Sequence, residues 1–284
     1  MHMENNERLL IIHADDFGMC HATNQAIIQL LDEESISSTT LMVNCPWSLE
    51  AAKAAASNPK YDVGIHLTLT SEWDHYKWGP VNQNGNVDTL VNEFGYFPAD
   101  LEKVAQADRE QVREEIIAQI ETALKMGVDP THIDSHMGAY LFFMDIHINV
   151  AATYNLPLRF TKNPPPGYSL ESLEQVAQLA DSKGILYPDN VVALPFILKE
   201  GESYEDSKQN AINLLKGLKP GVTELLFHPS LDTDELKGIT DTWQVRKYEF
   251  DIFRDPEVKE IIREENIKVI GWRELRDIQR GVEK

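Results

Sequence analysis

Two adjacent carboxylates, Asp15 and Asp16, stand directly after the apolar run Leu9–Ile12. Short apolar runs of this kind are typical of buried parallel strands. Neighbouring carboxylates at a strand end repel each other and lose hydration, and a divalent cation is the simplest charge that offsets both costs. The pair suggests a metal centre. For the pair alone, a turn, or Asp16 capping a helix that begins near Ala22, is the simpler explanation.

Two histidines occupy comparable places in other predicted strands. His66 lies in the alternating segment Asp62–Thr70, and His136 closes the segment Thr131–His136. Two imidazoles with one carboxylate form a ligand set that leaves coordination positions open. A single histidine in a strand is more often a core residue, but two at strand ends beside a spare aspartate pair favour ligation. Asp134 shares a face with His136 and is placed to orient a neighbouring imidazole.

Three further polar residues belong to the same predicted strand edge. His228 follows an apolar run and suits a general acid, with a buried histidine bonded to the backbone as the alternative. Arg159 is suited to clamp a carboxylate such as Asp15, with an ordinary ion pair as the alternative. Asn44 follows the second predicted strand and is a candidate substrate contact.

A long segment without regular periodicity, Ser71–Asp100, carries several aromatic side chains. Flat aromatic rings suit the apolar faces of sugars. Trp73 and Trp78 are therefore predicted to contact a carbohydrate substrate. Packing of this segment against the core is an equally good explanation for any one of these rings.

The elements that must position these residues alternate between strand and helix. Such alternation predicts a parallel sheet flanked by helices, with polar residues of several strands meeting at one edge. We expect seven or eight such steps in a single domain spanning residues 1–284, with irregular segments at Ser71–Asp100, Thr161–Ser169 and His228–Tyr248. The remaining predicted strands are Ser37–Val43, Pro157–Thr161, Val191–Leu194, Thr223–Phe227 and Ile267–Ile270, and the predicted helices include Glu110–Met126, Asp145–Tyr154, Leu170–Ser182, Tyr204–Leu218 and Arg273–Arg280.

Composition restricts the class of partner. The chain has 284 residues, 42% of them hydrophobic, and a formal charge of −20. A surface this acidic, without a separate basic patch, argues against binding to nucleic acid and to anionic membranes. Two cysteines make no disulfide framework. Without a secretory signal or a long apolar run, the chain is expected in the cytoplasm.

Four segments in order along the chain resemble the YdjC-like (ChbG) carbohydrate deacetylases: Ile12–Gly18 (IHADDFG), Gly64–Thr68 (GIHLT), Thr131–His136 (THIDSH) and Phe227–Pro229 (FHP). The resemblance implies an α/β fold, a seven-stranded TIM-like (βα) barrel of the NodB polysaccharide deacetylase type. It also implies a divalent metal, magnesium first and zinc as the alternative.

The same resemblance implies a role for each matching residue. It makes Asp16, His66 and His136 the metal ligands, Asp15 the catalytic base, His228 the general acid, and Arg159 the partner of the base. The chain departs from the family pattern in two places. His13 stands where many members have asparagine, and Met137–Tyr140 stands where many have further histidines.

The implied activity is that of a hydrolase acting on linear amide C–N bonds. It would remove the N-acetyl group from N-acetylated sugars such as N-acetylglucosamine oligosaccharides, diacetylchitobiose among them. The expected partner is a small carbohydrate, and a homodimer or larger homo-oligomer is expected. Two alternatives stay open: another metal-dependent sugar enzyme, such as an isomerase or a phosphoesterase, and a non-catalytic or regulatory sugar-binding barrel.

Overall fold

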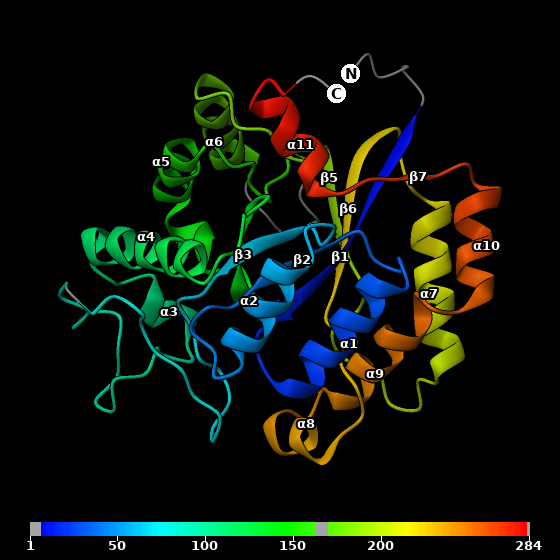
Figure 1. Cartoon of the computed structure of the whole chain (residues 1–284), viewed down its shortest axis with the longest axis horizontal. Coiled ribbons are helices and arrows are strands. Elements are labelled where there is room, and N and C mark those ends of the chain that lie inside the picture. The colour runs from blue at the N-terminus through cyan, green and yellow to red at the C-terminus, as the bar shows by residue number, and fades with distance from the viewer. Residues whose placement is uncertain (1–6, 84, 163–169, 283–284) are drawn as a thin grey trace.

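A computed structural model describes residues 7–83, 85–162 and 170–282 of the chain. Its strands form one parallel sheet in the order β4-β3-β2-β1-β6-β5, and β7 pairs separately with β1 (Figure 1). The strands are β1 (Arg8–Phe17), β2 (Ser38–Leu41), β3 (Val63–Leu67), β4 (Ile133–Ser135), β5 (Asn190–Ala193), β6 (Gly221–Phe227) and β7 (Lys268–Val269).

The central strand, β1, is longer than its apolar run predicts. Nine of its ten residues are buried, as expected for a strand covered on both faces. It pairs with β6 from Arg8 to Ala14, with β7 at Leu9 and Leu10, and with β2 from His13 onwards. The strand continues through Asp15 and Asp16, so the two carboxylates lie within the sheet and do not follow it.

The α/β fold with a parallel sheet is confirmed, but the predicted seven-stranded TIM-like barrel is present only as a half-barrel that does not close. The expected strand Pro157–Thr161 reduces to one bridge, between Leu158 and Ile133 of β4. On its other side, Leu158 donates its backbone N–H to the carbonyl of Leu186. Proline at 157 has no N–H to donate, which removes one hydrogen bond that a longer ladder with β4 would use. A seam therefore separates β4 from β5 among the described residues.

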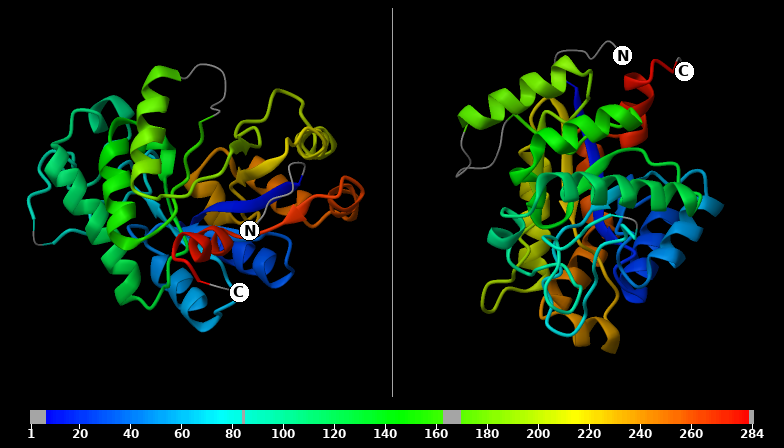
Figure 2. Two further views of the ribbon diagram at one scale, coloured as in Figure 1. Left: turned by 90° about the horizontal axis from the view of Figure 1, so that it is seen from above. Right: turned by 90° about the vertical axis from the view of Figure 1, so that its left-hand side faces the viewer.

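Helices cover the outer side of the sheet (Figure 2). The predicted helix Glu110–Met126 is confirmed as α4, one residue earlier at each end, and the side chain of Asp108 caps its first turn. None of the helices in the described ranges is long and apolar enough to cross a membrane. The helical elements are α1 (His21–Asp32), α2 (Ser48–Ser57), α3 (Leu101–Val104), α4 (Arg109–Lys125), η1 (His136–Phe142), α5 (Met144–Tyr154), α6 (Leu170–Ser182), α7 (Tyr204–Lys216), α8 (Asp234–Ile239), α9 (Trp243–Ile252), α10 (Pro256–Glu264) and α11 (Trp272–Gln279).

Two long connections lie at the end of the sheet opposite α11, where the strands have their carboxyl ends (Figures 1 and 2). The first, residues 71–100, has no helix or strand in its described part, as predicted. The second connection begins at His228. The segment His228–Tyr248 was predicted to be irregular, and this prediction is wrong, because the segment contains α8 and the start of α9. The predicted irregular segment Thr161–Ser169 falls largely outside the described residues.

Candidate metal centre and active site

The backbone of β1 brings two consecutive carboxylates into one site. In a regular strand, the side chains of Asp15 and Asp16 would point to opposite faces. The pairing with β2 is irregular between Ala14 and Phe17, and Asp16 has a φ of 70°. An irregularity of this kind re-aims a side chain, and aspartate tolerates the left-handed region better than most residues. Both carboxylates are buried, with exposed fractions of 4% for Asp15 and 0% for Asp16.

Asp16, His66 and His136 converge from three strand ends. Their candidate ligand atoms all lie within 4.8 Å of one another, and all three residues are buried. Oδ1 of Asp16 lies 3.6 Å from Nε2 of His66 and 3.4 Å from Nδ1 of His136. This oxygen has no hydrogen-bond partner, although it is buried. An unpartnered buried carboxylate oxygen facing two imidazoles fits a divalent cation.

Two carboxylates orient the imidazoles of this group. Oδ1 of Asp134 lies 2.6 Å from Nδ1 of His66, which leaves Nε2 to face Asp16. Oε2 of Glu72 lies 3.0 Å from Nε2 of His136, which leaves Nδ1 to face Asp16. Carboxylate–histidine pairs of this kind commonly support metal ligands.

The raised pKa values of His136 and His66 indicate that the surrounding carboxylates favour positive charge at this position. Burial alone would lower the pKa of His136, but Glu72 and Asp16 together outweigh burial and raise it to about 10. The pKa of His66 is also raised, because Asp134 and Asp15 outweigh its burial. A metal ion would replace these protons and satisfy the same carboxylates.

Asp15 is held by Arg159, whose segment lies next to β4 at the seam. Two guanidinium nitrogens of Arg159 lie 2.9 and 2.7 Å from the Asp15 oxygens. The same guanidinium contacts Asp134 and Glu224, each at 2.9 Å. Burial opposes ionisation of Asp15, yet Arg159 and nearby histidines outweigh it and hold the pKa of Asp15 well below its usual range. Asp15 is therefore a fixed, ionised carboxylate.

His228 lies beside Asp15, with its Nε2 3.7 Å from the Asp15 Oδ2. Its backbone N–H donates to the Glu249 side chain at 2.8 Å. Burial lowers the pKa of His228 to about 4, although Asp16 and Asp15 act in the opposite direction. Burial also raises the pKa of Glu249 to about 8. The imidazole of His228 is therefore neutral near pH 7.

The residues predicted to bind substrate lie on the side of the 71–100 connection. Asn44 donates to the Gly79 carbonyl and to Glu115, so its amide holds this connection in place. Trp78 is 2% exposed and donates its indole N–H to the Thr70 carbonyl, which leaves little of its ring for a sugar. Trp73 is half-buried, beside Arg246.

Arg246 of α9 is a site residue that sequence reasoning missed. Its Nη1 lies 2.8 Å from Oδ2 of Asp16, and it is 1% exposed. Burial alone would raise the pKa of Asp16, but Arg246 and nearby histidines lower it well below its usual range. The missed signal was the helical i,i+3 spacing of Arg246 and Glu249 on one face of α9.

The departure at His13 is part of the same buried network. Its Nε2 lies 3.2 Å from Asp15, and its Nδ1 lies 3.4 Å from Glu224. Behind it, His132 stacks on Trp272 with ring centroids 4.3 Å apart. Burial lowers the pKa of His132 well below its usual value. His132 is therefore a buried neutral ring that packs against His13, with ring centroids 5.1 Å apart.

The fold and the site together define a parallel α/β half-barrel with a candidate metal centre at the carboxyl ends of its strands. Residues 9–264 match the YdjC-like protein family, so the chain belongs to this family.

Two curated relatives, both named carbohydrate deacetylase, are each 31% identical to the chain. The match to the relative from Thermoanaerobacter pseudethanolicus covers 93% of this chain and 98% of the relative. The match to the one from Thermus thermophilus covers 95% and 94%. A solved structure from Enterococcus faecalis V583, provisionally named a cellobiose-phosphate cleavage protein, superposes with a TM-score of 0.78 at 29% identity, covering 95% of this chain and 99% of that one.

Proposed function

We propose that this chain is a metal-dependent carbohydrate deacetylase that hydrolyses the N-acetyl amide of N-acetylated sugars, with N-acetylglucosamine oligosaccharides such as diacetylchitobiose as substrates. The observation that carries the proposal is the position of Asp15, paired with Arg159, beside the buried group of Asp16, His66 and His136. Membership of the YdjC-like family and relatives named carbohydrate deacetylase support it.

Asp16, His66 and His136 would hold the cation. When bound, a divalent cation supplies a Lewis acid for the amide carbonyl and lowers the pKa of a bound water. The family resemblance favours magnesium, whereas two imidazole donors are more typical of zinc. Elemental analysis of protein purified and then incubated with each metal decides between them.

Asp15 would act as the base, a role supported by its ionised state and its contact with Arg159. It takes a proton from the attacking water, whose oxygen forms the new bond to the acyl carbon. The C–N bond then breaks, and the departing nitrogen must gain a proton. His228, 3.7 Å from Asp15, lies where it can receive the proton from Asp15 and donate it to the nitrogen. The products are acetate and the free amino sugar.

The direct test is release of acetate from N-acetylated mono- and disaccharides, with and without EDTA and with added Mg²⁺ or Zn²⁺. We expect acetate and amino sugar in equal amounts, loss of release in EDTA, and recovery with one of the metals. Release of phosphate from sugar phosphates would instead favour a phosphoesterase. Sugar binding without acetate release, in metal-loaded protein, would favour a non-catalytic role and contradict the proposal.

A further inference from the structure

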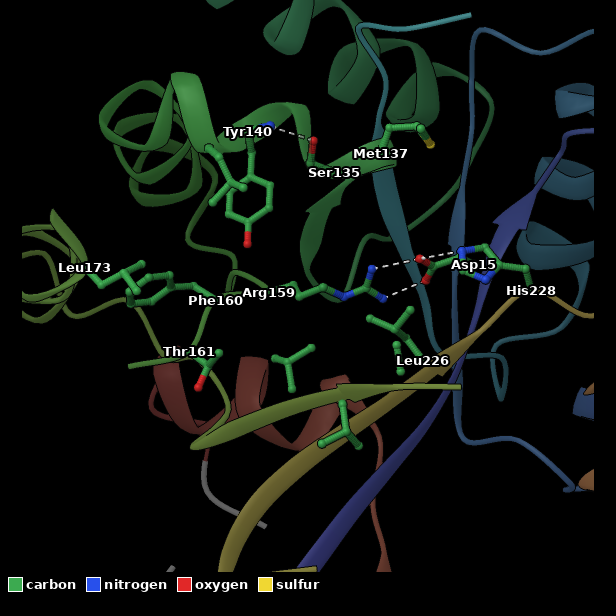
Figure 3. Close-up of a pocket in the computed structure, with 15 residues that line it drawn as sticks. Asp15, Ser135, Met137, Tyr140, Arg159, Phe160, Thr161, Leu173, Leu226 and His228 are labelled. Carbon is green, nitrogen blue, oxygen red and sulfur yellow. Dashed lines mark hydrogen bonds and ion pairs between the residues drawn. The ribbon is translucent and has the colours of Figure 1, made fainter. Parts of the chain in front are cut away.

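A cavity of about 300 Å³ opens from the candidate catalytic residues into the seam of the half-barrel (Figure 3). Asp15 and His228 lie at one end, and Phe160 and Leu173 at the other (Figure 3). The cavity passes between η1, which contributes Met137 among others, and β5. A closed barrel would fill this space with paired strands, so the cavity follows from the open seam.

The backbone conformation of η1 shapes one wall of the cavity. Met137 and Gly138 both have left-handed backbone conformations, with φ of 54° and 68°. Left-handed conformation is rare for a residue with a side chain, and it turns the chain sharply after His136. Met137 is 46% exposed at this turn. The segment that departs from the family pattern therefore forms part of the cavity wall.

Most of the lining away from the catalytic end is apolar, although Tyr140 and Thr161 also lie there (Figure 3). The Thr161 hydroxyl donates to the Asp189 carbonyl at 2.7 Å. Leu141, Phe160, Leu173 and Leu226 present hydrocarbon, as does β5. Each sugar hydroxyl placed here would give up water without gaining a partner from these side chains, which is costly. The cavity volume of about 300 Å³ is at the lower end of the range for small-molecule pockets. It is nevertheless far larger than the single methyl group of an acetyl substituent requires. The lining therefore suits a hydrocarbon chain.

The position of the cavity indicates which part of a substrate would enter it. Asp15 lines the cavity, and its Oδ2 also lies 3.9 Å from Nε2 of His66 in the candidate metal group. An amide carbonyl directed at that group would have its acyl substituent beside Asp15 and the seam. The departing nitrogen would lie near His228, which lines the catalytic end of the cavity with Asp15, and the sugar would extend out of the cavity.

We propose that this cavity receives the acyl chain of the scissile amide, so that amino sugars N-acylated with chains of four to six carbons are better substrates than N-acetyl ones. This inference rests on the amide hydrolysis proposed above and extends it. The chemistry is unchanged: water adds its oxygen to the acyl carbon, the C–N bond breaks, the nitrogen gains a proton, and a longer carboxylate replaces acetate.

The test compares N-acetyl-, N-butanoyl- and N-hexanoylglucosamine as substrates of the metal-loaded protein, by following glucosamine release. Burying one methylene favours binding by about fourfold. We expect kcat/KM to rise along the series by at least about tenfold from acetyl to hexanoyl. A fall in kcat/KM with each added methylene would overturn the inference and leave the proposed deacetylation intact, whereas no glucosamine from any member would contradict the proposed function.

A second measurement tests whether the acyl chain of the substrate lies in the seam. Leu173→Trp fills the far end of the cavity and is expected to lower the hexanoyl-to-acetyl ratio of kcat/KM by about tenfold or more. Gln178→Trp adds the same indole to the exposed side of α6 and should leave the ratio unchanged. An unchanged ratio in a folded Leu173→Trp protein overturns the assignment.

Calorimetry on the metal-free protein keeps the test independent of turnover. Hexanamide, which is neutral and carries the same acyl chain as the substrate, should bind more tightly than acetamide, and Leu173→Trp should remove the difference. Equal binding of the two amides to the unsubstituted protein would overturn the inference even if no substrate is hydrolysed.

Discussion

Nη1 of Arg246 lies 2.8 Å from Oδ2 of Asp16, although 230 residues separate them in the chain. Both side chains are almost completely buried. The contact occupies one carboxylate oxygen and leaves the other facing His66 and His136 without a partner. Arg246 thus keeps Asp16 ionised and directs its free oxygen at the candidate metal position.

We expect Arg246→Gln to destabilise the metal-free protein by about 3–5 kcal/mol, because it leaves a buried carboxylate without its cation. Bound metal would supply positive charge at the other oxygen, so the loss should shrink when metal is present. Urea unfolding in EDTA and in saturating metal measures both values. Arg254→Gln, which breaks a partly exposed pair with Glu33, should cost at most about 1 kcal/mol in either condition. An equal loss from Arg246→Gln in the two conditions would contradict this role.

Asp134→Asn tests the support of His66. The asparagine can still accept a hydrogen bond from Nδ1, but it no longer strengthens the imidazole as a donor to metal. Metal affinity should fall by about 10–100-fold. Calorimetric titration with Mg²⁺ and Zn²⁺ measures it, and Asp129→Asn, at a carboxylate 72% exposed, is the control. Unchanged affinity would contradict the role of Asp134 in supporting His66 as a ligand.

Asp15→Asn separates catalysis from metal binding. We expect kcat to fall by about 10²–10⁴-fold, because the base is lost, while metal content stays at the unsubstituted level. Arg159 keeps its contacts with Asp134 and Glu224, so the fold should persist. Asp74→Asn, in the exposed part of the 71–100 connection, serves as the control. Full turnover in Asp15→Asn would exclude Asp15 as the base.

His147 makes stability depend on pH away from the site. Its Nδ1 lies 3.0 Å from the Phe143 carbonyl, and its buried Nε2 has no hydrogen-bond partner. Burial lowers its pKa to about 4, below the value of about 6.5 expected when the chain unfolds. The unfolded state therefore binds the proton first as pH falls, and stability should drop between about pH 6.5 and pH 4 by roughly 3 kcal/mol.

The measurement is urea unfolding at pH 7 and at pH 4.5. His147→Leu should flatten the dependence on pH, because it removes the titrating group, while the Phe143 carbonyl still accepts the backbone N–H of residue 147. His75→Gln, at an exposed histidine, should keep the dependence of the unsubstituted protein. A slope unaffected by His147→Leu would assign the acid sensitivity to other groups.

The sequence allowed the parallel sheet and most elements to be predicted, because burial on two faces demands apolar runs and amphipathic helices demand a stripe. α6 falls where its pattern predicts, at Leu170–Ser182. The second long connection was misread, because α8 and α9 are short and polar enough to resemble a loop. The prediction of a strand at Pro157–Thr161 was wrong in the opposite sense, because it expected regular structure where there is little. An apolar pattern carries no information about whether a neighbouring strand is there to pair.

By itself, the sequence determined the residue types at the strand ends and the motifs that identify the YdjC-like family, since both are properties of the chain in order. Only the tertiary structure decided the backbone turn that puts Asp16 beside Asp15, the contact of Arg246 with Asp16, and the open seam with its apolar cavity. These three features depend on which distant segments meet and on how the chain closes around them. Local patterns do not encode such long-range contacts.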